Sequence, residues 1–324
     1  MKTASQVLHL VNTAIETMPL DRKPQGLYEP VRYVLSLGGK RIRPVLMLMG
    51  YGLYHDDIDT IMPTALGIEV YHNYTLLHDD VMDKADLRRG RPTVHRVWNE
   101  TAAILSGDAM LVLAYQLMQQ TAPRHLAPVL SLFTETALQI GEGQQYDVEF
   151  ESRLDVTETE YLEMIRLKTS VLLAAALRIG AIQADAPESD AQALYHFGEN
   201  LGLAFQIQDD LLDVYGDPAT FGKKIGGDIL CNKKTFLLIH ALQGANARQR
   251  CALMQWLDTT DAEPHEKIDA VTALYDAVGV RATAEKAINA HFLRALEALD
   301  QVAVAPERKT ALRDLAFTLL GRQS

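Results

Sequence analysis

Three aspartates at the end of an apolar stretch are the residues of this sequence whose types and spacing most clearly suit chemistry. Asp79, Asp80 and Asp83 follow the mostly apolar residues 70–77 and precede a pair of arginines. On a helix, Asp79 and Asp83 project from one face, one turn apart. Stacked carboxylates repel each other, and Mg²⁺ relieves that repulsion by binding one or two carboxylates together with phosphate oxygens. For one cluster alone, a solvated acidic helix end is the ordinary alternative.

A second copy of the pattern favours the metal interpretation. Asp209, Asp210 and Asp213 repeat the spacing near the end of a long apolar stretch, and a polar loop with lysines follows. If the two helices face each other, six carboxylates would line one end of an apolar cavity. Mg²⁺ bound there would hold an anion whose other oxygens are taken by lysine and arginine. Such cations stabilise a diphosphate as a leaving group, so the pattern indicates an enzyme that acts on a lipid-like diphosphate.

Composition and charge narrow the class of protein. The chain has 324 residues, 48% of them hydrophobic, and a net charge of −11, which disfavours nucleic acid as a partner. Cys231 and Cys251 indicate neither a disulfide framework nor a zinc site. The first 20 residues carry too many polar side chains for a signal peptide, and no run approaches the roughly 18 apolar residues of a membrane span. We therefore expect a cytoplasmic protein without stable membrane insertion.

Helical periodicity of apolar residues dominates the chain, and no strand-like alternation is convincing. The C-terminal part, 236–322, predicts four or so amphipathic helices. No linker rich in proline, glycine or serine divides the sequence, so we expect one all-α domain spanning 1–324. The predicted helices before residue 236 cover 4–18, 27–37, 44–54, 60–83, 100–120, 125–150, 161–182 and 189–215.

Two further groups of cations stand out. Lys40, Arg41 and Arg43 lie between the Gly38-Gly39 pair and a helix start, where an anion site and a basic helix cap are equally good interpretations. Lys168 lies inside the nearly all-apolar stretch 161–182. Alanines follow it at 174–176 and predict close packing, so a buried, paired lysine is more plausible here than a snorkelling surface residue.

Taken in order, these segments resemble the trans-isoprenyl diphosphate synthases of the polyprenyl synthetase family, in particular the short-chain farnesyl and geranylgeranyl diphosphate synthases. The matching segments, from Gly38 to Thr235, are GGKRIRP, HDDVMDKADLRRG, GQQYD, KTS, FQIQDDLLD, GKKIGGD and NKKT. The resemblance implies long antiparallel helices around a central apolar cavity, usually in a homodimer. It also implies condensation of isopentenyl diphosphate with dimethylallyl, geranyl or farnesyl diphosphate, with three Mg²⁺ ions, through ionisation, condensation and elimination.

The resemblance further implies a role for each matching residue of the two aspartate clusters. Asp79 and Asp83 would bind two Mg²⁺ ions, and Asp80 would support them. Asp209 would bind the third ion, with contributions from Asp210 and Asp213. Thr169 and Gln206 would place oxygens near the developing carbocation, and Gln144 and Asp147 would line the same cavity or make helix-terminal hydrogen bonds.

Two sets of cations would hold the substrates. His72 precedes Asp79 by seven residues and hence shares its helix face, which favours a ligand over a core histidine. The allylic diphosphate would be held by Arg88, Lys168, Lys223 and Lys233. The isopentenyl diphosphate would be held by Lys40, Arg43, His72 and Arg89.

Product length is expected to depend on the helix before the first aspartate cluster. In the family that the chain resembles, the residues four and five before the first aspartate help to form the tunnel floor, and here these are Thr75 and Tyr74. Ideal helix geometry leaves Tyr74 about 140° from Asp79, whereas Thr75 and Tyr71 lie at about 40° and about 80°. Tyr71 is therefore expected to share the floor. One aromatic residue at the fifth position resembles archaeal-type geranylgeranyl synthases, and we expect a product of about fifteen to twenty carbons, with twenty preferred.

Two alternatives from other classes are weaker. A class I terpene cyclase shares the helical fold and one DDxxD cluster, but its second metal site mixes Asn, Ser or Thr, and Glu. A non-catalytic subunit of a heteromeric synthase typically loses one cluster. The intact repeat at Asp209, Asp210 and Asp213 speaks against both.

Overall fold

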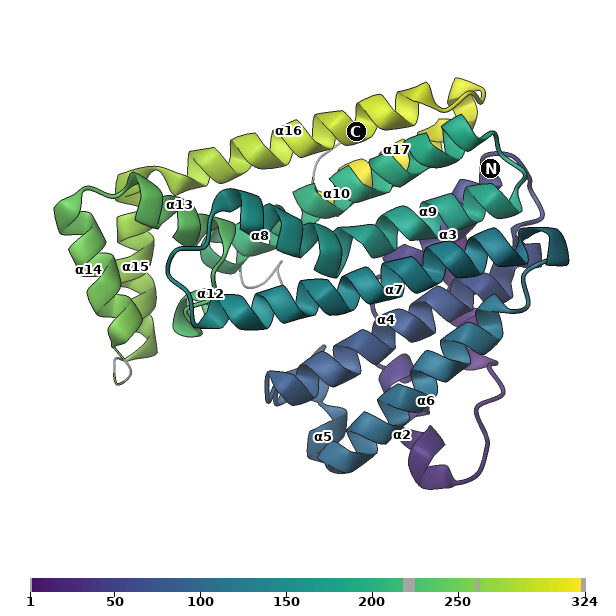
Figure 1. The fold of residues 1–324 in the computed structure, drawn as a ribbon, viewed down its shortest axis with the longest axis horizontal. Coiled ribbons are helices and arrows are strands. Elements are labelled where there is room, and N and C mark those ends of the chain that lie inside the picture. Colours follow the sequence, from purple (N-terminus) through teal and green to yellow (C-terminus); the bar gives the residue numbers. More distant parts are fainter. Residues whose placement is uncertain (1, 218–224, 260, 262, 322–324) are drawn as a thin grey trace. The chain divides into compact units, whose positions relative to one another are not determined.

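The structure is a computed structural model that describes residues 2–217, 225–259, 261 and 263–321, and nearly all of its elements are helices (Figure 1). The described strands are β1 (Leu87–Arg88) and β2 (Arg91–Pro92), which form an antiparallel ladder of two residues each. The predicted all-α class is confirmed.

Capping residues fix the starts of several helices, because their side chains satisfy the first backbone N–H groups. Thr3 and Gln6 form a capping box at α1, and Asn99 accepts from the Ala102 N–H at α6. The bounds of the first helices are α1 Ala4–Glu16, α2 Gln25–Ser36, α3 Ile42–Gly52, η1 Ile58–Ile61, α4 Met62–Met82, α5 Val94–Val97, α6 Glu100–Met118 and α7 Pro123–Glu151. The predicted helices match α1, α2, α3, α4, α6 and α7 to within about two residues at each end, whereas η1 and α5 were not predicted as separate helices.

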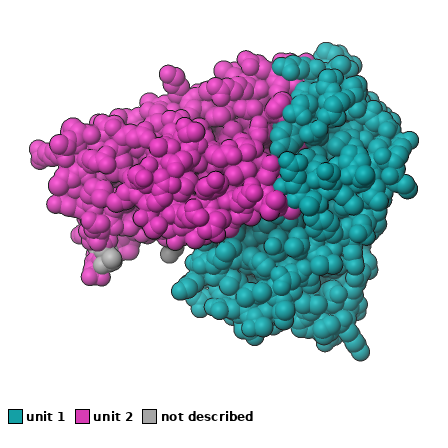
Figure 2. All heavy atoms as spheres, viewed as in Figure 1, with its two compact units in different colours: residues 1–135, 175–195, 301–315 teal, residues 136–174, 196–300, 316–324 magenta. Residues whose placement is uncertain are grey.

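The chain divides into two compact units (Figure 2). Unit 1 comprises residues 1–135, 175–195 and 301–315, and unit 2 comprises residues 136–174, 196–300 and 316–324. Unit 1 contains the first aspartate cluster and unit 2 contains the second. One domain spanning 1–324 stays a prediction.

Within unit 1, α4 and α6 lie side by side (Figure 1). Glycines allow this close approach: a Cβ atom on Gly67 of α4 would lie 3.1 Å from the Ala114 carbonyl oxygen, and one on Gly107 of α6 would clash with the His78 ring. The packing buries most of α4 before the aspartates. The cluster at its C-terminal end is therefore carried on a firmly anchored helix.

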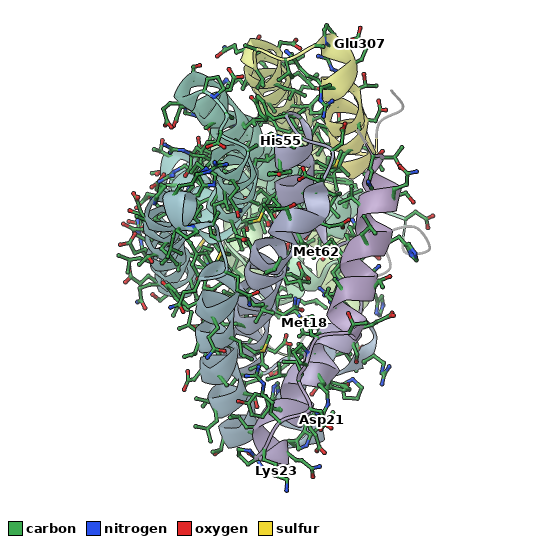
Figure 3. The ribbon with its side chains drawn as sticks, turned by 90° about the vertical axis from the view of Figure 1, so that its right-hand side faces the viewer. Met18, Asp21, Lys23, His55, Met62 and Glu307 are labelled. Carbon is green, nitrogen blue, oxygen red and sulfur yellow. The ribbon has the colours of Figure 1, made fainter. Side chains whose placement is uncertain are left out.

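The turn before α4 is tied to the start of α17 (Pro306–Leu319), whose residues up to 315 also belong to unit 1. Arg308 donates to the carbonyl oxygens of Gly52 and Leu53, which satisfies backbone groups at the end of α3. In Figure 3, His55, which follows α3, and Glu307, which precedes Arg308 in the sequence, are both labelled in the upper part of the view. Met62, labelled below them, opens α4.

In the part of the chain that the structure describes, α6 is the one helix long and apolar enough to cross a membrane by length and composition. No such segment was expected, because no apolar run in the sequence approaches about 18 residues, but the mean over an 18-residue window of α6 reaches a hydropathy of 1.4. Only 39% of that window is buried in the chain. Core helices of soluble proteins pass the same test, so α6 is weak support for a membrane span.

The predicted single helix over 161–182 is wrong in one respect, because a π-helical turn in unit 2 interrupts it. α8 (Glu158–Ile165) runs into the π turn η2 (Arg166–Ser170), and α9 (Val171–Gln183) follows. Two glycines let other helices approach the turn: a Cβ on Gly143 would clash with the Lys168 backbone, and one on Gly202 would lie 2.7 Å from Ser170 Cα. Single π turns inside helices occur often at functional sites, and apolar periodicity does not reveal them.

The remaining described helices complete unit 2 and part of unit 1. Their bounds are α10 Glu188–Tyr215, α12 Gly227–Leu230, α13 Phe236–Gly244, α14 Ala247–Asp258, α15 Pro264–Val278, α16 Val280–Gln301 and α17 Pro306–Leu319. Five helices thus follow residue 235, where four or so were predicted. α14 and α15 pack against each other within unit 2.

Candidate active site

In unit 1, the turn before α3 meets α4 at His72. Arg43 donates to His72 Nε2 across 3.0 Å, and both side chains are half-buried. Desolvation and the guanidinium groups of Arg43 and Arg89 hold the pKa of His72 well below its usual range, so its imidazole is neutral and accepts this bond at pH 7. Burial lowers the pKa of Arg43 to about 10, which still leaves it charged. A charged guanidinium beside a neutral imidazole can bind an anion.

The loop after α4 is joined to the same turn by Arg89. Its guanidinium donates to the Gly38 carbonyl oxygen and lies against Gly39, where a Cβ atom would come within 2.6 Å of it. Gly39 has φ 127° and Arg89 has φ 54°, so both turns use left-handed backbone. Lys40, which follows Gly39, is exposed. The structure thus brings Arg43, His72 and Arg89 to one turn of unit 1, and the backbone of Lys40 belongs to the same turn. These four residues are the ones predicted to hold isopentenyl diphosphate.

The first aspartate cluster keeps its predicted helical arrangement. Asp83 ends α4, and its N–H donates to the Asp79 carbonyl oxygen at 2.8 Å, so the two carboxylates belong to successive turns. Asp79 is half-buried and Asp83 is exposed. Asp80 is buried instead and accepts a fork of hydrogen bonds from Arg88, the shortest at 2.6 Å. Burial raises the pKa of Asp80, and Arg88 opposes that shift. Asp80 thus fixes the position of Arg88.

In unit 2, Asp210 is the centre of a buried hydrogen-bond network. Its Oδ2 accepts from the Tyr161 hydroxyl at 2.5 Å and from the Phe236 N–H at 3.2 Å. Its Oδ1 accepts from the Gln206 side chain at 3.2 Å, and the Gln206 oxygen accepts from Thr169 at 3.3 Å. The network joins the π turn, α8, α10 and α13 around one carboxylate. It fixes the orientation of the Gln206 amide and of the Thr169 hydroxyl.

The other two aspartates of the second cluster differ in their surroundings. Asp209 is half-buried, one residue before the network. Asp213 is buried and its Oδ2 accepts from the Asp228 N–H at 2.9 Å, which fastens α12 to the end of α10. The predicted metal contacts of Asp209 and Asp213 stay predictions, and the geometry gives Asp213 an anchoring contact as well.

Lysines accompany the second cluster within unit 2. Lys168, presented by the π turn, donates to Asp147 at 2.5 Å. Desolvation opposes the charge of Lys233, but Asp228, Asp210, Asp147 and Asp209 together raise its pKa above the ordinary value, so it is cationic at pH 7. Lys223 lies outside the described residues. Gln144, predicted to line the cavity, is half-buried on α7, one residue after Gly143.

The carboxylates present fit Mg²⁺ in donor type. Among the described residues, no three His, Cys, Asp or Glu side chains form a group that could hold a metal ion by themselves. Mg²⁺ usually retains several waters and takes one or two carboxylates plus substrate phosphate oxygens. A pair such as Asp79 and Asp83 on successive turns suits that coordination, whereas a zinc-type cage of protein ligands is not formed by the described part of the chain.

The predicted floor residues join an aromatic cluster of unit 1. Tyr71 is buried, with its ring 5.5 Å from that of Tyr74 and 5.2 Å from that of Phe133 on α7. The ring centroids of Phe133 and of Tyr115 on α6 are 5.0 Å apart. Thr75 donates to the His72 carbonyl oxygen within α4. The cluster therefore includes two rings, those of Tyr115 and Phe133, that were not predicted to belong to it.

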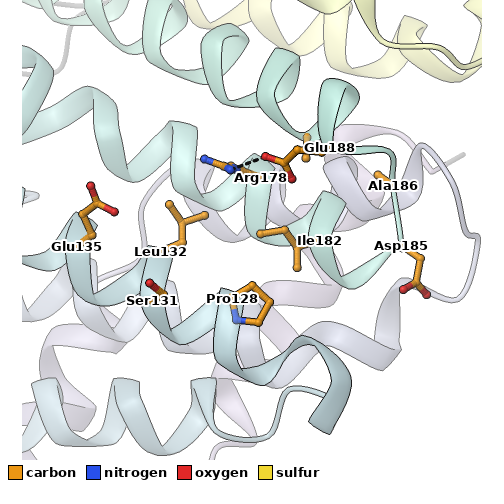
Figure 4. A pocket seen from close by; sticks show the side chains of 10 residues that line it. Pro128, Ser131, Leu132, Glu135, Arg178, Ile182, Asp185, Ala186 and Glu188 are labelled. Carbon is orange, nitrogen blue, oxygen red and sulfur yellow. Dashed lines mark hydrogen bonds and ion pairs between the residues drawn. The ribbon is translucent and has the colours of Figure 1, made fainter.

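A cleft of about 530 Å³ in unit 1 lies between α7, α9 and the start of α10 (Figure 4). Its lining contains three carboxylates and one cation, Arg178, whose guanidinium pairs with Glu188 at 2.6 Å. None of the predicted site residues lines it. Three carboxylates against one cation that is already paired make this lining unfavourable for a diphosphate, so we do not assign the substrate to this cleft.

Several residues that organise the site were not predicted from the sequence. Tyr161 and Phe236 hold Asp210, and no local pattern in the sequence indicates those contacts. Arg41 and Glu69 form a buried ion pair at 2.7 Å. A glutamate inside the apolar stretch 65–71 is a signal that could have identified this pair, because buried carboxylates are normally paired.

A helical protein with paired aspartate clusters, each accompanied by cations, defines the class of isoprenoid synthases. Comparison with known proteins then identifies the family. The polyprenyl synthetase family model matches residues 24–275, and the chain belongs to this family. It is accordingly a short-chain prenyltransferase with the isoprenoid synthase fold.

Three similar proteins illustrate this relationship. A short chain isoprenyl diphosphate synthase of Methanocaldococcus jannaschii is 41% identical over 257 residues, which is 79% of this chain and 78% of that protein. A geranylfarnesyl diphosphate synthase of Natronomonas pharaonis is 38% identical over 97% of this chain and 95% of that protein. A crystal structure of a geranylgeranyl pyrophosphate synthase superposes with a TM-score of 0.96, at 42% identity and complete coverage of both chains. Synthases of this kind generally use Mg²⁺.

Proposed function

We propose that the chain condenses isopentenyl diphosphate with dimethylallyl, geranyl or farnesyl diphosphate. The observation that carries the proposal is the cation cluster beside the first aspartates, in which Arg43 binds the neutral His72 and Arg88 is fixed by Asp80. Such a cluster provides separate places for two anions. Arg43 and His72 with Lys40 and Arg89 would hold the isopentenyl diphosphate, which does not ionise and needs no metal.

The reaction would begin with cleavage of the allylic carbon–oxygen bond, whose electron pair leaves with the diphosphate. Bound Mg²⁺, for which three ions are proposed, would neutralise the departing charge. Among the side chains, the metal contacts would come from Asp79, Asp83, Asp209 and Asp213, and the diphosphate contacts from Arg88, Lys168, Lys223 and Lys233.

Two fixed dipoles would stabilise the allylic cation. The Thr169 hydroxyl and the Gln206 oxygen are held by the Asp210 network, so they need no reorganisation when charge develops. The double bond of isopentenyl diphosphate would then attack the cation, forming the new carbon–carbon bond. Loss of a proton to the departed diphosphate would regenerate a double bond, and no basic side chain is required.

Product analysis by mass spectrometry tests this function. The purified protein with Mg²⁺ and isopentenyl diphosphate would be offered each of the three allylic diphosphates separately, and we expect elongated diphosphates from at least two of them. Conversion of an allylic diphosphate without isopentenyl diphosphate would indicate a terpene cyclase instead. No turnover by the purified protein would favour a non-catalytic subunit.

We propose a product of about fifteen to twenty carbons, with twenty preferred, within the range of roughly C15–C25 that related synthases span. The supporting feature is the aromatic cluster around Tyr71 and Tyr74, which fills space between α4 and Phe133 of α7 and precedes Asp79 on α4. Replacing Tyr71 and Tyr74 together by alanine opens that space, and we expect products longer by one or more isoprene units in the same mass spectra. Tyr33→Ala, away from the cluster, is the control, and an unchanged product distribution in the double variant would refute the floor.

We infer that two copies of the chain associate through α6. Ile104, Leu105 and Val112 share one face of this helix, since Val112 follows the adjacent pair Ile104 and Leu105 by eight and seven residues. They are 46%, 54% and 58% exposed. Exposed apolar patches of this kind mark interaction surfaces. Light scattering should give the mass of a dimer, and Val112→Asp should give a monomer while Gln116→Glu on the same face does not. A monomeric parent protein would contradict the proposal.

We also propose that the protein acts in the cytoplasm without stable membrane insertion. The α6 residues that face α4 are buried in protein, among them Ala103 and Met110. A second copy on the opposite face would cover the remaining apolar side chains. Recovery of the protein in the membrane pellet after a high-salt wash would contradict this proposal.

A further inference from the structure

A buried ion pair connects the turn before α3 to the middle of α4. Arg41 donates to Glu69 at 2.7 Å, and each side chain is only 2% exposed. The second arm of the Arg41 guanidinium donates to the Leu35 carbonyl oxygen near the end of α2. Three elements of unit 1 are thus joined through one guanidinium.

The backbone of this turn needs such a connection. Arg41 has φ 45° and ψ 36°, a left-handed conformation that is unfavourable for a residue other than glycine. Gly38 and Gly39, at φ 76° and 127°, precede it. A turn with three left-handed residues keeps one conformation only when surrounding contacts determine it, and the ion pair supplies the buried contact of Arg41.

Glu69 also interacts with the polar groups around it. Its Oε1 accepts from the Asn73 amide at 2.9 Å, one helical turn further along α4. Its negative charge raises the pKa of both Arg43 and Arg89, against the burial that lowers them. Glu69 therefore provides the buried negative charge that lets several guanidinium groups lie close together and remain charged.

The location of the pair follows from the helix period. Glu69 lies three residues before His72, on the neighbouring turn of α4, and Arg41 lies two residues before Arg43. Any shift of the turn relative to α4 would change the 3.0 Å contact between Arg43 and His72. Neither Arg41 nor Glu69 is exposed enough to touch a substrate, so an effect on binding must pass through these neighbours.

We propose that Glu69, through Arg41 and Asn73, is a positioning residue for the isopentenyl diphosphate site. It fixes the turn 38–43 on α4 so that Lys40, Arg43 and His72 present one preformed anion site. The inference rests on the proposed function, which assigns those three residues to isopentenyl diphosphate. The proposed role of Glu69 affects binding of isopentenyl diphosphate, and ionisation of the allylic substrate depends on other residues.

The test is the near-isosteric variant Glu69→Gln, which removes the charge and keeps the shape. We expect the KM for isopentenyl diphosphate to rise about tenfold, the lower end of the effect known for residues that support metal ligands. The KM for the allylic diphosphate should stay within about twofold and kcat should change little. Asn73→Leu removes only the amide contact and should raise the same KM by a smaller factor. It keeps the test informative if Glu69→Gln does not fold.

Asp190→Asn is the matched control, because Asp190 is another buried carboxylate of unit 1 that accepts from Tyr54 and the Ala303 N–H. It should lower the melting temperature and leave both KM values unchanged. An unchanged KM for isopentenyl diphosphate in folded Glu69→Gln, or equal increases for both substrates, would overturn the inference. Lys40→Ala distinguishes failure of this inference from failure of the proposed function. If Lys40→Ala also leaves the KM for isopentenyl diphosphate unchanged, the proposed substrate assignment is wrong. If Lys40→Ala raises that KM while Glu69→Gln does not, only the role of Glu69 is wrong.

Discussion

Replacing Asp79 by alanine is expected to lower kcat about a thousandfold at saturating Mg²⁺ and substrates. The reason is that a carboxylate proposed to hold metal on the leaving diphosphate stabilises charge that develops only as the carbon–oxygen bond breaks, and removal of one such electrostatic contact costs about 10²–10³ in rate. The measurement is steady-state turnover with radiolabelled isopentenyl diphosphate.

Asp86→Ala is the matched control for this variant. Asp86 follows the same helix and its side chain is 75% exposed, where its ion pair with Arg96 contributes little. Its kcat should stay within about twofold of the parent value. If Asp79→Ala retained turnover within tenfold of the parent, the assignment of the first cluster to the departing diphosphate would be wrong.

Replacing Asp210 by alanine is expected to lower the free energy of unfolding by about 3 kcal/mol and to abolish turnover. The substitution leaves the Tyr161 hydroxyl and the Phe236 N–H without their buried acceptor, and each unsatisfied buried donor costs about 1–3 kcal/mol. It also frees the Gln206 amide. Urea unfolding followed by circular dichroism measures the change.

Two further variants distinguish loss of the Asp210 network from loss of an ordinary hydrogen bond elsewhere in unit 2. Tyr161→Phe removes one donor and should cost about 1 kcal/mol. Tyr215→Phe, which breaks a hydrogen bond to Asp276 at the surface of unit 2, should cost less than about 0.5 kcal/mol. If the Asp210→Ala variant were as stable as the parent protein, the network would not be what holds α8, α10 and α13 together.

Local patterns predicted the helices that carry the aspartates closely. The predicted stretches 60–83 and 189–215 compare with α4 at Met62–Met82 and α10 at Glu188–Tyr215. Long apolar runs of fixed period leave little freedom in assigning such helices. The interruption at Arg166–Ser170 was not predictable, because it depends on glycines from two other helices.

The residue types of the site were predictable, but the partners of each side chain were not. Spacing predicted that Asp79 and Asp83 lie on successive turns of one helix, as they do in α4, whereas the roles that the resemblance implies for the cations of unit 1 stay predictions. That Asp80 holds Arg88, or that Asp213 holds the Asp228 N–H, depends on where distant segments pack. Tertiary contacts of this kind leave no periodic signal in a single sequence.

The π turn between α8 and α9 has a consequence for how the chain can change in length. A π turn holds one residue more than the α-helical turn it replaces, so a deletion of one residue within 166–170 could restore a regular α-helix and leave the later residues of α9 in nearly their present directions. Within the turn itself, Lys168 and Thr169 would leave their present directions. A deletion in this segment should therefore impair the site more than the fold.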